Sequence, residues 1–323
     1  MPSLSYYQRI FAAYLTPQKS QLTFWHEVPE VNENFRPGEL GEYYMPFTAK
    51  ADYPGQYDQN GIPLLNYHGK VGLQYNPIAI AQYGLGNYNL FRRTGSAERR
   101  NKFLRVADWL VTHLEQNPHG LWVWNHHFDW EYRTSLKAPW YSALSQGQGV
   151  SVLVRAHRET GDPRYLDSAA RAFVPFRKAM DDGGVSFTDS HGYLWFEEAI
   201  VQPPTHILNG FFWASWGVYD YYLQTREPIA LHLFQEAART LKDNLQQFDV
   251  GFWSLYERSG TRMQMLASPF YHSLHIVQLR VMHRLTNEPI FREYADKWDG
   301  YCKSVFKRNL ALAYKAVFKL LYY

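Results

Sequence analysis

The chain has 323 residues, a formal net charge of +3 and one cysteine, Cys302. The single cysteine excludes a disulfide framework and a thiolate metal site, and the small charge without lysine- or arginine-rich runs excludes a typical nucleic-acid-binding protein. No stretch reaches the ~20 apolar residues of a membrane span, and the first residues lack the apolar segment of a signal peptide, so we expect a cytoplasmic protein. Tryptophan and tyrosine are abundant, which fits an aromatic-rich core and also ring faces along a carbohydrate-binding cleft.

The first quarter of the chain differs in pattern from the rest. Apolar residues keep a helical period over 4–15, and Pro17 ends this short amphipathic helix. Residues 21–75 are punctuated by Pro, Gly and Asn, which predicts β-hairpins and long loops. We therefore predict an N-terminal helix and β-hairpin/loop arm, 1–74, followed by a helical catalytic domain, 75–323.

Four threonines mark an internal repeat in the helical part. Thr94, Thr160, Thr225 and Thr286 occupy equivalent places in links between two helices, at spacings of about 60 to 66 residues. In three copies a proline follows an acidic residue at the start of the second helix, where its missing N–H costs no hydrogen bond. The repeat predicts a series of helical hairpins.

The two helices of each hairpin differ in polarity. The first is apolar and rich in small residues and the second is amphipathic, as in 78–91 against 97–114. Buried inner helices that alternate with solvated outer ones predict a mainly α fold, an incomplete (α/α) toroid of about four helical hairpins. Short β-hairpin excursions at 121–132, 185–197 and 251–262 lead into inner helices, and we expect them to gather at one mouth of the toroid, where a cleft forms.

Polar side chains lie where the excursions meet the inner helices. No metal-binding, phosphate-binding or nucleophile-elbow motif is present, so the sequence predicts no metal site and no cofactor. Glu197 and Glu198 follow the aromatic run GYLWF, so one of these strand neighbours is expected to point inward, although a surface acid pair has the same pattern. Asn209 lies in HILNGF on an inner helix, where a buried amide either contacts substrate hydroxyls or is satisfied within the core.

The last inner helix begins in the segment SPFYHSLHIVQL and supplies further candidates. Tyr271 and His272 stand at its start, and His272 and His275 share a face at i and i+3. Packing alone also explains a tyrosine at a helix start. Tyr67 and Tyr75, which precede the first inner helix, complete this set of side chains.

The helix that contains QGQG has two internal glycines. Gly147 and Gly149 each cost ~1 kcal/mol relative to alanine in a helix interior, so we expect another inner helix to approach closely there. Gln146 and Gln148 beside them are candidate sugar contacts. Arg155, farther along the same helix, is a candidate for neutralising a substrate carboxylate, or simply the partner of an acid.

Four ordered segments carry a family resemblance, which extends over about 75–301. They are NPIAIAQYGL at 76–85, PWYSALSQGQGVSVLVRA at 139–156, WFEEAI with HILNGF at 195–211, and YHSLHIVQL at 271–279. Together they resemble the D-glucuronyl C5-epimerase family, which converts glucuronate to iduronate units within heparosan, the precursor of heparan sulfate. The resemblance implies an isomerase that needs no redox cofactor and whose partner is an anionic, uronate-containing polysaccharide. Because the C5 hydrogen lies α to a carboxylate, its removal and its return to the opposite face require two proton-transfer groups.

The resemblance also implies roles for individual residues. Tyr271 is similar to the family's tyrosine ahead of its final His-containing helix, Glu198 to its catalytic glutamate and Asn209 to its sugar-contacting asparagine. The adjacent Glu197, His272 and His275 are candidate substrate contacts.

Two positions depart from the family pattern. Ala199 stands where animal members carry a tyrosine, and Thr-Arg-Met at 261–263 stands where they carry another. The second proton-transfer group therefore stays open between Glu198, Tyr67 and Tyr75. Arg262 is the candidate for the carboxylate-binding arginine.

Three functions agree with these observations. The first is a C5-epimerase of uronate residues in a polysaccharide, with Tyr271 and Glu198 on opposite ring faces. The second is a uronan lyase, which starts with the same proton abstraction and then expels the C4 substituent. The third is a non-catalytic uronan-binding relative. A homodimer through the aromatic arm or the tail VFKLLYY is a further hypothesis.

Overall fold

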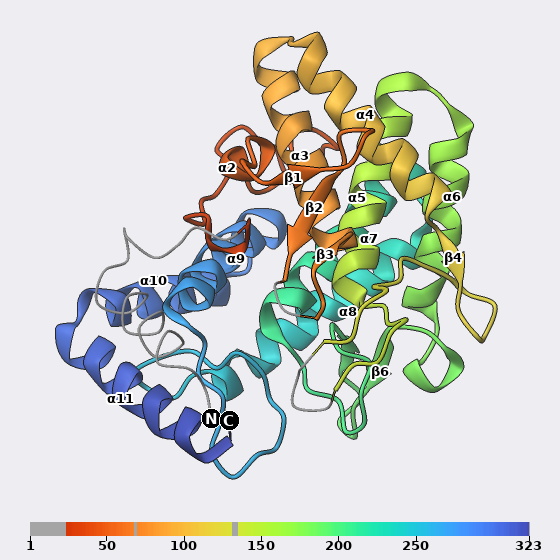
Figure 1. The fold of residues 1–323 in the computed structure, drawn as a ribbon. Coiled ribbons are helices and arrows are strands. Elements are labelled where there is room, and N and C mark those ends of the chain that lie inside the picture. The colour runs from red at the N-terminus through yellow and green to blue at the C-terminus, as the bar shows by residue number, and fades with distance from the viewer. Residues whose placement is uncertain (1–23, 68–69, 131–134, 323) are drawn as a thin grey trace. The chain divides into compact units, whose positions relative to one another are not determined.

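The computed structural model describes residues 24–67, 70–130 and 135–322 (Figure 1). The predicted helix at 4–15 lies outside the described residues. The chain divides into two compact units, one formed by 31–241 and the other by the N-terminal residues up to 30 together with 242–323. The predicted boundary between an arm, 1–74, and a helical domain, 75–323, stays a prediction.

Helical hairpins make up most of the unit 31–241. The first pair is α3 (Pro77–Thr94) and α4 (Ala97–Thr112), and the second is α5 (Ala143–Thr160) and α6 (Pro163–Phe173). The third is α7 (Leu208–Thr225) with α8 (Pro228–Asn244), whose last residues run past the end of this unit.

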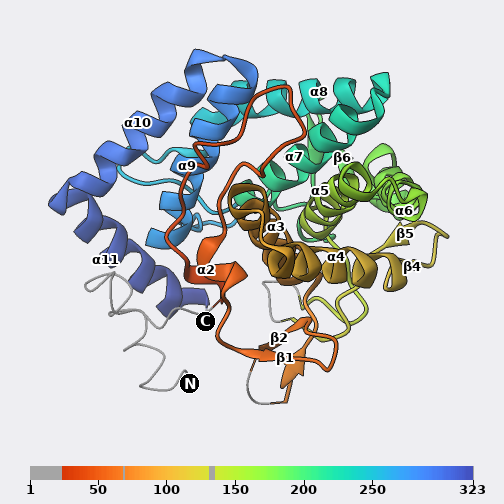
Figure 2. The same ribbon diagram turned by 90° about the horizontal axis from the view of Figure 1, so that it is seen from above.

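The first helices of these hairpins are the buried ones. Nearly all of α3, α5 and α7 is buried, and α5 packs on both α3 and α7. Seen from above, α4 and α6 flank α3 and α5 on their outer side (Figure 2). Tyr219 of α7 stacks on Phe234 of α8 at a ring-centroid distance of 4.4 Å. This confirms the mainly α class and the alternation of inner and outer helices that an α/α toroid requires.

One local hydrogen-bond pattern closes each link of the repeat. The threonine hydroxyl donates to the carbonyl four residues earlier at 2.7–2.9 Å, and it accepts from the amide two residues later at 3.2–3.3 Å. The residue that follows the threonine adopts a left-handed conformation, which ends the first helix. The positions are Thr94-Gly95, Thr160-Gly161, Thr225-Arg226 and Thr286-Asn287. The predicted repeat is therefore confirmed.

Short antiparallel strands precede the inner helices. In the arm, β1 (Gln56–Tyr57), β2 (Pro63–Asn66) and β3 (Leu73–Gln74) form one sheet, after the short helices η1 (Phe24–His26) and α2 (Thr48–Ala51). The excursions contain β4 (Glu115–Gln116) with β5 (Trp122–Val123), and β6 (Ser186–Thr188) with β7 (Leu194–Phe196), in which Ser186 pairs with Phe196. The excursion at 251–262 has isolated bridges in place of the predicted hairpin. The turns η2 (Val174–Arg177) and η3 (Met180–Asp182) connect α6 to β6.

The other unit contains the fourth hairpin. After η4 (Leu245–Phe248), α9 (Pro269–Thr286) packs on α10 (Pro289–Lys303), and α11 (Val305–Tyr322) packs on α10. Several apolar side chains of α11 are exposed, Phe306 and Leu320 among them. A homodimer through this tail stays a prediction. Among the described residues, no helix is both long and apolar enough to cross a membrane.

Glycines allow α5 and α7 to approach each other closely in the larger unit. A Cβ at Gly147 of α5 would lie 2.7 Å from Ala214 Cα of α7, and a Cβ at Gly217 would overlap the backbone of Gly147. This confirms the expected close approach for Gly147. Gly149 has a different neighbour, because a Cβ there would meet the Trp124 ring from the first excursion.

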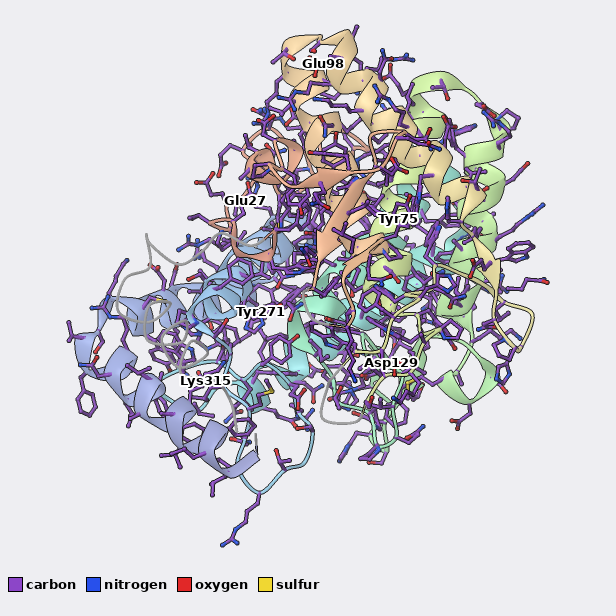
Figure 3. All side chains as sticks on the ribbon, viewed as in Figure 1. Glu27, Tyr75, Glu98, Asp129, Tyr271 and Lys315 are labelled. Atoms are coloured by element: carbon purple, nitrogen blue, oxygen red, sulfur yellow. The ribbon has the colours of Figure 1, made fainter. Side chains whose placement is uncertain are left out.

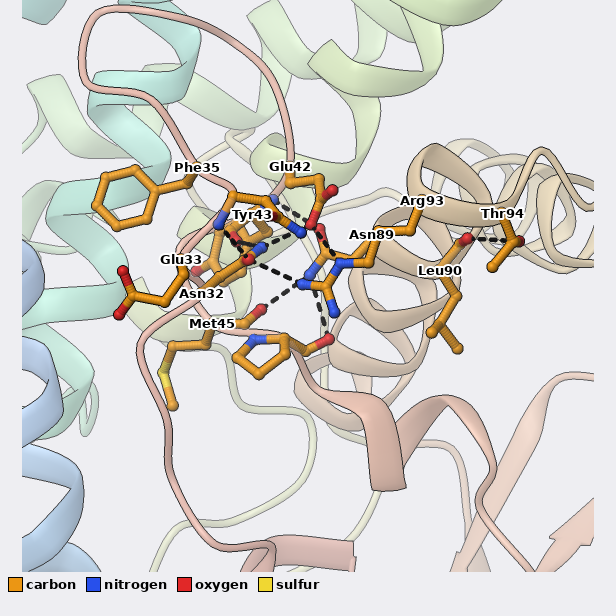
Figure 4. A network of polar contacts seen from close by, with 12 residues as sticks. Asn32, Glu33, Phe35, Glu42, Tyr43, Met45, Asn89, Leu90, Arg93 and Thr94 are labelled. Carbon is orange, nitrogen blue, oxygen red and sulfur yellow. Dashed lines mark hydrogen bonds and ion pairs between the residues drawn. The ribbon is translucent and has the colours of Figure 1, made fainter.

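Polar contacts hold the arm against the inner helices. Asn89 of α3 accepts from the amide of Tyr43 at 2.7 Å and donates to the carbonyl of Met45 at 2.9 Å (Figure 4). Arg93 pairs with Glu42 at 2.8 Å. Because backbone groups of 43–46 are bonded to α3, the arm has a fixed path over this helix.

Candidate active site

The two adjacent glutamates stand at the end of β7. The backbone of Glu197 is held on both sides, since its amide donates to the Val185 carbonyl at 2.8 Å and its carbonyl accepts from the Ala143 amide at 2.9 Å. Neighbouring side chains of an extended segment point in opposite directions. The structure therefore gives Glu197 and Glu198 different surroundings.

Glu197 is bound by His206. Its side chain has no exposed surface, and its two carboxylate oxygens contact His206 Nδ1 at 2.5 Å and the His206 backbone amide at 3.0 Å. His206 has φ 50, a left-handed conformation, and its ring stacks on Trp195 at 4.3 Å. Because Glu197 is enclosed in this way, we do not retain it as a direct substrate contact.

Glu198 is the member of the pair that faces α7. Asn209 Nδ2 donates to Glu198 Oε2 at 3.3 Å. Burial raises the pKa of Glu198, the bond from Asn209 opposes the rise and the charge of Glu197 adds to it, with a net pKa of about 8. A carboxyl group with a pKa near the working pH both accepts and releases a proton readily, so this side chain suits general acid–base chemistry.

Gly210 makes room for the Glu198 side chain. A Cβ at Gly210 would lie 2.8 Å from Glu198 Cβ and would overlap Glu198 Oε2. The glycine of HILNGF thus has a steric role beside the candidate carboxyl group, and sequence reasoning missed it because this motif drew attention only to Asn209.

Tyr271, labelled in Figure 3, lies in the first turn of α9 in the smaller unit. Its amide donates to Oγ of the N-cap residue Ser268 at 3.3 Å, which fixes the first turn. The Tyr271 ring is half-buried and meets the Tyr256 ring edge-on at 4.9 Å. Tyr256 is a second tyrosine at this place. Sequence reasoning missed it, although it lies within the third excursion, 251–262, which was expected to line a cleft.

A buried acid follows Tyr256 directly. Glu257 is 1% exposed. Burial raises its pKa to about 7, and a hydrogen bond with Ser259 opposes the rise. The third excursion therefore carries both a phenol and a buried carboxyl group.

His272 and His275, near the start of α9, have structural partners. His272 Nδ1 accepts from the Ser254 amide at 3.1 Å, and its Nε2 donates to the Trp298 carbonyl at 3.1 Å. His275 Nδ1 contacts Ser254 Oγ at 3.0 Å. Both rings are buried, and burial lowers the pKa of His272 to about 4 and that of His275 well below its ordinary value. Neutral, enclosed imidazoles fix the third excursion to α9, so we do not retain either as a substrate ligand.

The polar residues of α5 are also structural. Gln146 accepts from the Trp124 amide at 2.9 Å and donates to the Ala172 carbonyl at 2.9 Å. Gln148 accepts from Gln82 at 3.1 Å and is buried. Both amides are buried and form hydrogen bonds within the core, and their role as sugar contacts stays a prediction.

Arg155 forms a buried ion pair. Its Nη1 and Nη2 donate to the two oxygens of Asp220 at 2.6 and 3.1 Å, and neither side chain is exposed. Tyr44 donates to Asp220 at 2.7 Å, and Arg155 Nε donates to the Gly41 carbonyl at 2.9 Å. Arg155 therefore ties α5, α7 and the arm together, and the alternative of an acid partner is the correct one.

The remaining predicted residues lie apart from the glutamates in the chain and have other partners. Tyr67 accepts from Asn76 at 2.7 Å, and burial raises its pKa. Tyr75 donates to Asp58 at 2.8 Å, and burial raises its pKa to about 12. Both phenols stay protonated at neutral pH, so neither is suited to act as a base. Arg262 is exposed in the segment before α9.

Comparison with known proteins identifies relatives over the helical part. The model of the D-glucuronyl C5-epimerase C-terminus family matches residues 116–300. A D-glucuronyl C5-epimerase of Caenorhabditis elegans is 31% identical over 220 residues, which are 63% of this chain and 35% of that protein. An uncharacterised protein of Methanocaldococcus jannaschii is 31% identical over 59% of this chain and 62% of its own length. The chain thus matches about a third of the nematode enzyme and somewhat less than two thirds of the archaeal protein.

Solved structures show more distant similarity. Cellobiose 2-epimerase of Spirochaeta thermophila is 15% identical, with 78% of this chain and 64% of that chain covered and a TM-score of 0.49. Unsaturated glucuronyl hydrolase of Bacillus sp. GL1 is 14% identical, with 69% and 61% covered and a TM-score of 0.47. The family model spans more than half of the sequence, and on that ground the chain belongs to the D-glucuronyl C5-epimerase C-terminus family.

Proposed function

We propose that the protein catalyses C5-epimerisation of glucuronate to iduronate residues within a heparosan-like polysaccharide. Family membership supports the reaction class. The observation that carries the proposal is the Glu198 carboxyl group, whose pKa is raised to about 8 beside the amide of Asn209. This group gains and loses a proton near neutral pH, as a reversible epimerase requires.

In the proposed reaction Glu198 and Tyr271 serve opposite faces of the sugar ring. The Glu198 carboxylate removes the C5 proton, and the C5–H electron pair moves into the adjacent carboxylate to give an enolate-like intermediate. The Tyr271 hydroxyl then donates its proton to the other face of C5, which leaves a tyrosinate. A phenol with a reference pKa of ~10 is a donor at neutral pH, whereas the ionised Glu198 is an acceptor.

Two further side chains complete the proposal. Asn209 orients Glu198 through the 3.3 Å contact and offers its amide to a sugar hydroxyl. Arg262, which is exposed, binds the substrate carboxylate and offsets the charge that develops there. Because Glu198 ends protonated and Tyr271 ends ionised, both exchange with solvent before the next turnover, and solvent hydrogen enters at C5.

Incubation of heparosan with the protein in deuterated water tests the proposal. NMR is expected to show deuterium at C5 and new iduronate signals. Absorbance from unsaturated uronate would instead identify a lyase, since that product forms only when the C4 substituent leaves. Glycan binding without hydrogen exchange would identify a non-catalytic relative, and either result would overturn the epimerase assignment.

Substitution Tyr271→Phe is expected to abolish deuterium incorporation at C5 while leaving the far-UV spectrum and melting temperature close to wild type, because only a hydroxyl group is removed. Tyr75→Phe is the matched control, since it removes a phenol hydroxyl bonded to Asp58 outside the proposed pair. Exchange is expected to persist in this control. Normal turnover in Tyr271→Phe would contradict the role given to Tyr271.

A further inference from the structure

We propose that His206 is a positioning residue for Glu198, because it binds the carboxylate of Glu197, fixes the loop that carries Glu198, and offsets the charge next to the reacting group. The inference rests on the proposed function and deepens it. His206 itself does not contact the substrate in this scheme and acts through Glu197.

His206 contacts the Glu197 carboxylate through both its backbone and its ring. Backbone amide and ring Nδ1 both reach the same carboxylate, at 3.0 and 2.5 Å. The left-handed backbone, φ 50, brings these two groups to one side, and non-glycine residues adopt this conformation at a cost unless their surroundings hold them there. Trp195 covers one face of the ring at 4.3 Å. The local strain is therefore offset by two polar contacts with Glu197 and by the stacking of the ring on Trp195.

The contact closes the loop that contains the candidate site. Glu197 and His206 are nine positions apart, with Glu198 at the first position after Glu197. His206 immediately precedes Ile207, the N-cap of α7, and Asn209 lies in the first turn of that helix. Joining the two ends of the loop thus fixes Glu198 relative to Asn209, whose Nδ2 lies 3.3 Å from Glu198 Oε2.

The charge of Glu197 acts on Glu198. It contributes to the raised pKa of Glu198, as described above. If the His206 imidazole is protonated, its positive charge offsets the charge of Glu197. If it is neutral, Nδ1 still donates a hydrogen bond to the Glu197 carboxylate and so reduces the effect of that charge on Glu198. Other acids nearby in the described part of this unit are Asp189, which accepts from Trp195 at 3.1 Å, and Asp181, which accepts from Gln202 at 3.3 Å. In α7 the acid is Asp220, which Arg155 neutralises.

Two substitutions are expected to move the titration of Glu198 in opposite directions. Glu197→Gln removes the neighbouring negative charge, so Glu198 ionises at lower pH. His206→Asn removes the imidazole and leaves that charge exposed to Glu198, so Glu198 ionises at higher pH. Asparagine is suitable because it tolerates positive φ and keeps the backbone donor. Each shift is expected to be about half a pH unit or more.

The test follows the side-chain carboxyl carbons of 13C-labelled glutamate by NMR across pH, with Glu198→Gln to assign the Glu198 signal. This measurement needs no substrate and no activity, so it stands even if heparosan exchange fails in the wild-type protein. In the double variant Glu197→Gln/His206→Asn, Glu198 is expected to titrate as in Glu197→Gln alone, because no charge remains for His206 to offset. If His206 acted only on the structure, His206→Asn would shift the Glu198 titration by the same amount in the wild-type protein and in Glu197→Gln.

Several outcomes overturn the inference. Shifts in the same direction for the two single variants would do so, as would an unchanged titration in His206→Asn. Should His206→Asn not fold, Glu197→Gln alone decides, since an unchanged Glu198 titration there would refute the charge coupling. With an active wild type, His206→Asn is further expected to lower kcat at least tenfold with KM nearly unchanged, as the loss of alignment affects the reacting carboxyl group.

Discussion

At the scale of single residues, the structure separates two glutamates that are equivalent in the sequence. Glu197 is enclosed by His206, and Glu198 lies against Asn209 with a raised pKa. The sequence predicted that one of the pair points inward, from strand alternation and the aromatic run before it. Which of them stays available depends on His206, nine residues away, and no local pattern reveals that contact.

Gly210 provides a sharper test of the Glu198 geometry than removal of the acid itself. Gly210→Ala places a methyl group against Glu198 Cβ and Oε2, so the carboxyl group is displaced from Asn209. We expect C5 exchange to fall at least tenfold, because small misplacements of a catalytic group are costly. Exchange rates of Gly210→Ala and Gly300→Ala are compared, since Gly300 of α10 has open space around its Cα. Equal rates would show that Glu198 tolerates displacement.

The surroundings of Tyr271 were predicted less completely. Tyr271 was found through a motif at a helix start, where local signals are strong. Tyr256 comes within 4.9 Å of it only through the packing of the third excursion on α9. His272 and His275 share a helix face, as predicted, yet that face is turned to Ser254 and the core. Periodicity identifies a common face but not what covers it.

At the scale of elements, the glycines of α5 and α7 decide the contact between these helices. For Gly147 of α5 the close approach was expected from the cost of glycine in a helix, whereas Gly217 of α7 was not singled out. Gly149 shows the limit of that reasoning, because its neighbour is an indole from an excursion rather than a helix. A glycine inside a helix indicates that a neighbour approaches closely, but the sequence does not identify that neighbour.

We expect Gly217→Ala to reduce the free energy of unfolding by about 1–3 kcal/mol or more, as the new methyl group overlaps the Gly147 backbone, which cannot rotate away. Gly300→Ala is again the control, and it is expected to stabilise by about 0.5–1 kcal/mol through helix propensity. Urea denaturation of the two variants measures both effects. An unchanged free energy of unfolding in Gly217→Ala would mean that α5 and α7 separate readily.

At the scale of the whole molecule, buried titratable groups determine how stability depends on pH. Burial raises the pKa of Glu198 to about 8 and of Glu257 to about 7, from an ordinary value of 4.5. Burial lowers the pKa of His126 to about 3 and of His272 to about 4, and that of His275 well below 6.5. The folded chain thus favours neutral acids and neutral imidazoles at these positions.

These shifts predict maximum stability near pH 6.5. Below 6.5 the unfolded histidines bind protons that the folded ones do not, so stability falls as pH decreases toward 4. Above 4.5 the unfolded glutamates lose protons that the folded ones keep, so stability falls as pH rises through 7 and 8. Below pH 6.5 the three imidazoles change the stability with pH more than the two carboxyl groups do. Above pH 6.5 the carboxyl groups dominate the change. Denaturation across pH 4–9 measures the profile, and Glu198→Gln is expected to flatten its alkaline side. A maximum at pH 8 or higher would contradict the argument.

The hairpin links have a consequence for how such a chain can grow. Every bond that closes a link joins residues within a few positions of one threonine, and glycine, arginine and asparagine all serve at the following left-handed position. A link therefore carries the instructions for its own turn and requires no matching change elsewhere. A segment with this property can be duplicated with its two helices intact, so that the copies are free to diverge in their helices, excursions and chemistry while the connecting turn is inherited unchanged.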